Sequence, residues 1–199
     1  MAQVIIRAQG MIDSTGRMQS AGSKRAGCLF LLCAVLLAGC SVKAPVLAQG
    51  ELEAQDREKA AQLEMLLEGL GQKVDVREAK LLARDSIRYA YTLSERYDLV
   101  WPPLLHNTLV NVGLKDRGLC YQWADDMQAH MLKSGYKSFD FYLGVSHPGS
   151  YFEHNTLVVS AKGAGFSHGV VLDPWRDSGK LFFAKIDEDP KYVWDHREE

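Results

Sequence analysis

Three residues in the second half of the chain have the types needed for thiol-based catalysis: Cys120, His154 and Asp173. A thiolate is a strong nucleophile, and an imidazole held by a carboxylate can accept and return the proton that such chemistry moves. Cys120 is expected to open a helix, where unpaired backbone N–H groups and aligned peptide dipoles favour the thiolate. The order Cys, His, Asp therefore predicts a nucleophile, a base and a group that orients the base.

The spacing of His154 and Asp173 predicts that they meet on one face of a sheet. They fall at the ends of two consecutive expected strands, His154 at the start of one and Asp173 at the end of the next, and a glycine-rich turn at 162–165 connects these strands. In a symmetric hairpin, residues whose numbers sum to 327 would face one another, so His154 would lie directly opposite Asp173. The apolar residues Trp123 and Met127 share a helical face with Cys120, so we expect the thiol to meet this sheet rather than solvent.

An export signal is predicted for residues 1–39. Lys24 and Arg25 precede eleven apolar residues, 28–38, about half of the roughly 20 that a membrane-spanning helix requires. The run ends in Leu-Ala-Gly-Cys, which resembles the bacterial lipoprotein cleavage box. The resemblance implies that Cys40 is acylated, with palmitate among its acyl chains, and becomes the new N-terminus. An ordinary cleaved signal peptide is the alternative. Ser41 implies the periplasmic face of the outer membrane if the source is Gram-negative, so we expect a lipid-anchored protein of the cell envelope.

The mature chain, 40–199, has 160 residues, enough for one domain. Cys28 and Cys33 leave with the signal and Cys40 is blocked, so Cys120 is expected to be the one free thiol and no internal disulfide can form. With 19 Lys+Arg against 24 Asp+Glu the formal charge is −5, which disfavours a nucleic-acid partner. No HxxxH pair, second free cysteine or DxDxDG loop occurs, so no metal or other cofactor is expected.

The hydrophobic pattern changes from helical to strand-like near Gly135, which predicts an α+β fold in which the Cys120 helix packs on an antiparallel sheet. Asp75 followed by Glu78 has the form of a capping box. A tether at 40–50 and a spacer helix at 51–71 are expected to precede the domain, which would span 75–199. The spacer helix has one apolar face, formed by leucines at helical spacing: Leu63, Leu66, Leu67 and Leu70. Within the domain we expect helices at 75–97, 104–112 and 120–134 and strands at 139–145, 155–160, 169–172 and 181–186.

The residues around the three chemical groups resemble the transglutaminase-like superfamily of cysteine enzymes. The matching stretches lie within 118–175 and read Gly-Leu-Cys at 118–120, His-Asn-Thr-Leu-Val-Val at 154–159 and Val-Leu-Asp-Pro-Trp at 171–175. The resemblance implies a papain- or transglutaminase-like core, with Cys120 as the acylated nucleophile, His154 as general base and acid, and Asp173 as its partner. Asn155 to Leu157 stand where this family often has an aromatic residue.

We therefore expect an enzyme that hydrolyses peptide or isopeptide amide bonds in a protein or peptide substrate through a thioester. Three alternatives remain open: a protein-crosslinking transglutaminase, a cell-wall peptidase, although its Asp-Cys-Ser-Gly signature is missing, and a non-catalytic peptide-binding lipoprotein. The backbone N–H of Cys120 is one expected oxyanion donor. A second donor must come from elsewhere: Trp101, Asn107 and Asn111 lie upstream and could reach the site, but each is equally well explained as a core or capping residue. The loop 147–150 is a candidate rim of the site.

The signal is complete when read from Met18, and residues 1–17 fit poorly as part of it. We predict that translation starts at Met18 or Met11. Mutation of the Met18 codon is expected to abolish the protein, as measured by immunoblot of cells, whereas mutation of the Met1 codon is expected to leave its amount unchanged. Unchanged expression without the Met18 codon would argue against that start site.

Overall fold

A computed structural model describes residues 52–198 of the chain. The predicted signal, the cleavage box with Cys40, the start sites and the tether lie outside the described residues and stay predictions. No helix within 52–198 combines the length and the apolar character that crossing a bilayer requires. The described part is α+β with an antiparallel sheet, as the sequence predicts; it has four α-helices and five strands.

The helices are α2 (Ala54–Glu68), α3 (Val76–Arg96), α4 (Pro103–Asn111) and α5 (Cys120–Ser134), within a few residues of the predicted ranges. The Asp75 carboxylate caps α3 by accepting hydrogen bonds from the N–H groups of Arg77 and Glu78, at 2.8 and 3.1 Å. Glu78 does not complete the expected capping box. Its carboxylate instead accepts from the N–H groups of residues 137 and 138, which ties α3 to the segment that leads into the sheet.

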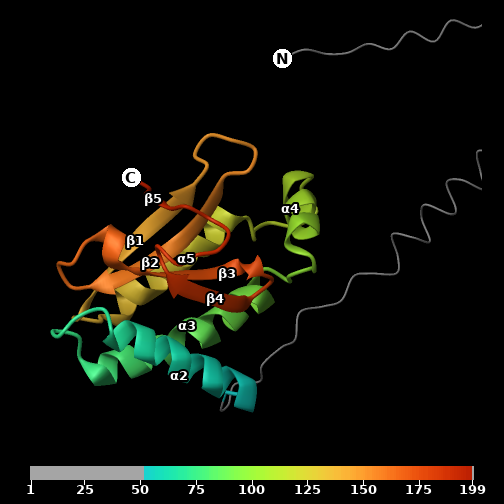
Figure 1. The fold of residues 1–199 in the computed structure, drawn as a ribbon. Coiled ribbons are helices and arrows are strands. Elements are labelled where there is room, and N and C mark those ends of the chain that lie inside the picture. The colour runs from blue at the N-terminus through green and yellow to red at the C-terminus, as the bar shows by residue number, and fades with distance from the viewer. Residues whose placement is uncertain (1–51, 199) are drawn as a thin grey trace, which may run out of the picture. The chain divides into compact units, whose positions relative to one another are not determined.

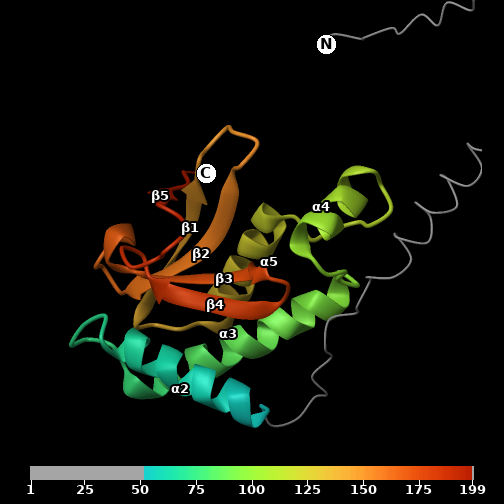
Figure 2. The same ribbon diagram turned by 45° about the vertical axis from the view of Figure 1, so that its right-hand side comes forward.

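The sheet has the order β4-β3-β2-β1-β5, and every neighbouring pair is antiparallel (Figures 1 and 2). The two-residue β5 was not predicted, because so short a strand carries no periodic pattern. A 3₁₀ turn, η1 (Phe166–His168), lies in the connection between β2 and β3. The strands are β1 (Phe139–Ser146), β2 (His154–Ala161), β3 (Val170–Asp177), β4 (Lys180–Lys185) and β5 (Asp195–His196).

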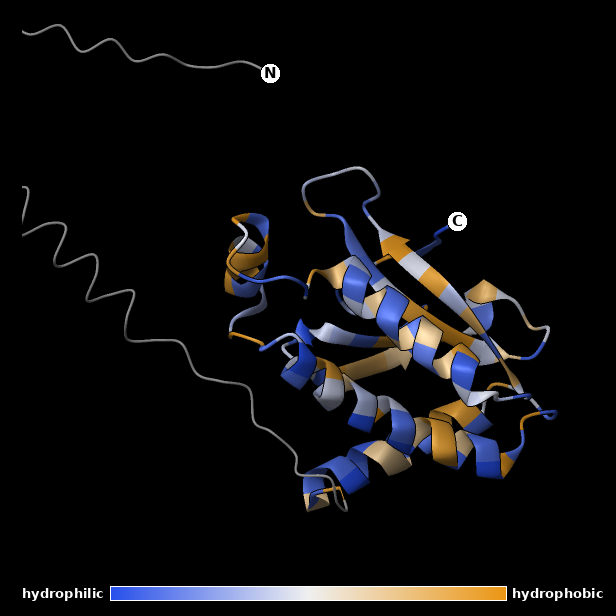
Figure 3. Cartoon of the chain, turned by 180° about the vertical axis from the view of Figure 1, so that it is seen from behind, coloured by the Kyte–Doolittle hydropathy of each residue, from blue (hydrophilic) through white to orange (hydrophobic). Residues whose placement is uncertain are grey.

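Helix α5 covers one face of the sheet and the C-terminal segment covers part of the other. Figure 3 shows α5 and α3 in front of the sheet, and Figure 1, seen from the opposite side, shows the chain beyond β4 crossing the other face. Trp123 of α5 and Leu157 of β2 share the main core, whereas Val158 of β2 packs with Trp194 of the C-terminal segment. Because both faces are covered, all eight residues of β2 are buried.

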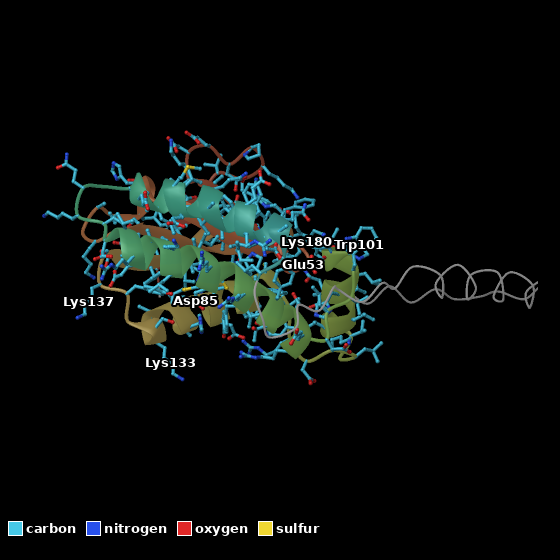
Figure 4. The ribbon with its side chains drawn as sticks, turned by 90° about the horizontal axis from the view of Figure 1, so that it is seen from below. Glu53, Asp85, Trp101, Lys133, Lys137 and Lys180 are labelled. Atoms are coloured by element: carbon cyan, nitrogen blue, oxygen red, sulfur yellow. The ribbon has the colours of Figure 1, made fainter. Side chains whose placement is uncertain are left out.

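Helix α2 is part of the domain, which corrects the prediction of a spacer helix ahead of a domain that begins at residue 75. It packs along α3, as Figure 4 shows from below, and Leu63 and Leu67 are fully buried in the main core. Lys59 Nζ also donates a hydrogen bond to the backbone oxygen of Leu181 on β4, at 3.0 Å. The leucine stripe was recognised correctly as one apolar face, but the stripe alone does not say which surface covers it.

The packing of α2 predicts a large difference between two neighbouring apolar positions. Leu67→Ala removes a fully buried side chain and is expected to lower the free energy of unfolding by roughly 2–5 kcal/mol. Met65→Ala is the matched control, because Met65 is 65% exposed on the same helix, and it is expected to change stability by at most about 0.5 kcal/mol. Urea unfolding of both variants measures this; equal, small effects would mean that α2 is a spacer after all.

Candidate active site

Cys120 is the first residue of α5, and the loop before it is held in place by hydrogen bonds from the helix. The Gln122 side-chain oxygen accepts from the N–H groups of Gly118 and Leu119, at 2.7 and 3.1 Å, and Trp123 Nε1 donates to the Gly118 oxygen at 3.0 Å. Gln122 therefore caps the start of α5 from within the helix. The Leu119 oxygen accepts from the N–H groups of Gln122 and Trp123, at 2.9 and 3.1 Å, so the N–H groups of Cys120 and Tyr121 are the ones at the start of α5 without an acceptor inside the helix.

A buried histidine fixes the other end of that loop. His106 is fully buried on α4, its Nδ1 accepts from the Val100 N–H at 3.2 Å, and its Nε2 donates to the Arg117 oxygen at 2.8 Å. Burial lowers the pKa of His106, in keeping with a neutral ring that serves as a structural bridge. Gly118 has φ +126°, and a Cβ there would stand 2.2 Å from His106 Nε2. The loop that leads into Cys120 therefore requires glycine at position 118.

His154 and Asp173 form the buried ion pair that the sequence predicts. His154 Nε2 donates to Asp173 Oδ2 at 2.6 Å, and the two side chains are 3% and 0% exposed. Burial by itself lowers the pKa of His154, but the charge and hydrogen bond of Asp173 outweigh it and, with a smaller contribution from Cys120, raise that pKa to about 9. Burial raises the pKa of Asp173, and its contacts with His154 and Arg176 outweigh this and lower it.

The register that produces this pair differs from the predicted one. Leu157 faces Leu172 and Val158 faces Val171, so paired residue numbers sum to 329 rather than 327. His154 and Asp173 are therefore diagonal neighbours instead of direct partners. They still share one face, because a shift of two in this sum preserves the alternation of side chains between the two faces. The parity predicted from the sequence was right, and the exact register was wrong.

That shared face is the one turned away from α5, so Cys120 does not meet His154 beneath the helix. His154 and Asp173 have the parity of Val158 and Val171, which belong to the cluster on the face covered by the C-terminal segment. Cys120 is half-buried and meets the imidazole at the end of β2, where its Sγ lies 3.9 Å from the Glu153 oxygen. The expected inward position of the thiol is corrected to a position at the edge of the sheet.

The remaining ring nitrogen of His154 faces no hydrogen-bond partner. Nε2 is used by Asp173, and Nδ1 is buried without a partner among the described residues. No hydrogen bond of acceptable geometry joins Nδ1 to Cys120, yet the thiol is near enough to contribute to the raised pKa of His154. His154 and Asp173 are thus joined directly, and Cys120 lies close to the imidazole without a hydrogen bond to Nδ1.

Three aromatic rings enclose the imidazole. The ring centroids of Trp175, Tyr192 and Trp194 lie 4.7, 4.6 and 5.4 Å from that of His154. Trp175 Nε1 donates to the Asn107 side-chain oxygen at 3.1 Å, so Asn107, one of the three upstream oxyanion candidates, links α4 to β3 instead. Trp101 is 54% exposed, and Asn111 is exposed at the end of α4.

Two charged residues of the site were missed by sequence reasoning. Arg176 Nε donates to Asp173 Oδ2 at 3.0 Å, and the same guanidinium makes two further hydrogen bonds to Asp189 in the C-terminal segment, at 3.0 and 2.7 Å. Arg176 directly follows the Asp-Pro-Trp motif, which was a usable signal for a partner of Asp173. No local pattern marks Asp189, because it reaches Arg176 only through the path of the folded chain.

A pocket of about 340 Å³ borders the C-terminal segment and not the thiol; it is lined by residues that include Phe166, Asp189, Tyr192 and Trp194. Within residues 52–198, no group of three or more His, Cys, Asp or Glu side chains is arranged to hold a metal ion. Comparisons with protein-family models, curated proteins and solved structures found no match to this chain. The chemistry of the site is therefore the basis for any function.

The raised pKa of His154 predicts how stability depends on pH. A group whose pKa rises from 6.5 to about 9 on folding stabilises the fold fully below pH 6.5, and this contribution is lost as the pH rises through 9. Between pH 6 and pH 9.5 we expect the free energy of unfolding to fall by up to about 3 kcal/mol more in the wild type than in His154→Gln. Denaturant unfolding at the two pH values measures this difference, and parallel pH profiles would contradict it.

Proposed function

We propose that this protein is a cysteine hydrolase that cleaves peptide or isopeptide amide bonds through a thioester on Cys120. The observation that carries this proposal is the buried His154 imidazole, which is bound to Asp173 through Nε2, has a free Nδ1, and lies near enough to the half-buried Cys120 thiol for the thiol to affect its pKa. We further propose that the core is papain- or transglutaminase-like; the thiol at a helix start and the imidazole and carboxylate on adjacent antiparallel strands support this.

The first half of the proposed reaction forms the thioester. The Cys120 thiolate attacks the carbonyl carbon of the amide, so that a carbon–sulfur bond forms and the carbonyl oxygen takes the negative charge. Collapse of this intermediate breaks the carbon–nitrogen bond, and the His154 imidazolium gives its proton to the departing nitrogen. The raised pKa of His154 suits this step, because the imidazolium is present at neutral pH.

The second half releases the acid. Neutral His154 takes a proton from water, the resulting hydroxide forms a carbon–oxygen bond, and the carbon–sulfur bond breaks to restore the thiolate beside the imidazolium. Asp173 remains ionised throughout and stabilises the imidazolium each time it forms. The backbone N–H of Cys120 at the start of α5 is the proposed donor to the oxyanion, with the dipoles of that helix adding to it.

The loop between β1 and β2 supports a polypeptide substrate. Tyr151 and Phe152 are 96% and 75% exposed, and they precede Glu153, whose backbone oxygen lies near the thiol. Exposed aromatic rings next to a reactive group provide contact area for apolar side chains of a bound peptide. We propose in addition that the enzyme works in the cell envelope, attached to a membrane through acylated Cys40 after removal of residues 1–39.

Alkylation by iodoacetamide tests whether the thiol is activated. In the mature chain with Cys40→Ser, Cys120 is the single thiol, and we expect it to react at least about tenfold faster at pH 6.5 than in His154→Gln. His130→Gln is the matched control, because His130 also contacts a carboxylate, Asp85 at 2.9 Å, but lies further along α5. Mass spectrometry measures the rate of alkylation in each protein. Equal rates in the wild type and both variants would refute activation by His154.

Turnover is tested in cells. Envelope proteins from cells with the wild-type chain, with Cys120→Ala or with His154→Gln are compared by mass spectrometry for newly formed peptide termini. We expect a set of termini that occurs with the wild type and is absent with both variants. Cross-linked peptides in place of new termini would indicate transamidation, and identical profiles from the three strains would reject an enzymatic role.

A further inference from the structure

The chain beyond β4 forms a C-terminal strap, residues 187–198, that returns over the sheet and adds β5 beside β1 (Figures 1 and 2). Its anchor is Asp189, whose side chain is fully buried. The Asp189 carboxylate accepts two hydrogen bonds from Arg176, one from Trp194 Nε1 at 2.9 Å and one from the Lys191 N–H at 2.9 Å. Burial opposes its ionisation, but these bonds outweigh it and lower the pKa of Asp189 to about 2.

Arg176 connects this anchor to the candidate active site. Its Nε donates to the same oxygen of Asp173 that binds His154, and its backbone N–H donates to the other oxygen at 3.1 Å. The guanidinium side chain is 8% exposed and lies 3.7 Å over the ring of Phe182. A planar guanidinium with hydrogen bonds on two sides has little freedom to rotate, so the position of Asp189 determines where Arg176 meets Asp173.

The strap also contacts the imidazole directly. The rings of Tyr192 and Trp194 lie 4.6 and 5.4 Å from that of His154, and Trp194 is only 7% exposed. These rings keep water away from the ion pair beneath them, and in such surroundings charges interact more strongly than in water. One segment therefore supplies both a wall of the site and a charge that acts on it.

The charges near the imidazole form a row of His154, Asp173, Arg176 and Asp189. This row is neutral when His154 is protonated and carries one negative charge when it is not, so the buried quartet favours the imidazolium. Two further titratable groups adjoin the ring: Cys120 from α5 and Tyr192 from the strap. Glu153 directly precedes β2, and its carboxylate accepts from the Gly149 N–H and the Asn155 side chain instead.

We propose that the strap is a positioning device for the site: Asp189, acting through Arg176, fixes the charge and orientation of the Asp173 carboxylate that holds His154. Arg176 and Asp189 are positioning residues and touch no reacting atom. The inference rests on the proposed function where it concerns catalysis, but the effect of Arg176 and Asp189 on the pKa of His154 does not depend on turnover.

Titration of His154 in three variants tests the proposal. Asp189→Asn leaves the Arg176 charge uncompensated beside Asp173, so the pKa of His154 is expected to fall by about one unit. Arg176→Gln removes a cation and is expected to raise it by a similar amount. The double variant removes one charge of each sign and is expected to titrate within about half a unit of the wild type. NMR spectra of the imidazole signals across pH measure the pKa of His154 in the wild type and the three variants. The spectrum of His154→Gln identifies which signal belongs to His154.

A merely structural strap gives a different pattern. If Arg176 and Asp189 only hold the segment in place, both single variants shift the pKa of His154 in the same direction, and the double variant deviates from the wild type at least as far. That result overturns the proposal. The double variant has amides that can still hydrogen-bond to each other at positions 176 and 189. If it folds and its His154 pKa differs from that of the wild type, the proposal is contradicted, even where a single variant unfolds.

The rate of Cys120 alkylation adds a readout of reactivity. At pH 7 iodoacetamide is expected to react several-fold more slowly with Asp189→Asn than with the wild type, and within about twofold of the wild type with the double variant. Failure of the proposed function and failure of this inference are distinguishable. If Cys120 reacts at the same rate with and without His154, the proposed function is rejected. If the pKa of His154 shifts in the same direction whichever charge is removed, the positioning role of the strap is rejected.

Discussion

The buried carboxylate of Asp173 is the constraint on which the rest of the site depends. An ion removed from water costs several kcal/mol unless other groups replace its hydration. Here His154, the Arg176 guanidinium and the Arg176 backbone N–H supply the replacement, and the side chain is fully buried. Each of these partners is held in turn: the imidazole by three aromatic rings and the guanidinium by Asp189. The carboxylate thus connects β2, β3 and the C-terminal strap.

The strand β2 carries the imidazole between two layers of different kind. Helix α5 and the main core cover one face, and the strap with its aromatic rings covers the other. The thiol comes from the start of α5, at the edge where the two layers meet, and its loop is held by Gln122 and His106. A regular helix and two paired strands define these positions, which suits chemistry that tolerates little misplacement.

Much of the fold and part of the site could be predicted, since local patterns report directly on local structure. The capping side chain of Asp75 and the left-handed Gly135 mark where α3 begins and α5 ends. Alternation along β2 and β3 gave the shared face of His154 and Asp173 even though the predicted register was off by two. The leucines of α2 were recognised as an apolar face, but their partner helix was not.

The sequence by itself determined the order of helices and strands, the start of α5 at Cys120 and the parity that unites His154 with Asp173. Only the tertiary structure decided the register of β2 and β3, which depends on a connection containing η1, and the packing of α2 on α3. It also decided the pairing of Arg176 with Asp189 and the edge position of the thiol. Periodicity and capping encode which face a residue occupies, because they depend on neighbours in the chain. The choice of partner depends on the path of the whole chain, which brings distant residues together and leaves no local pattern.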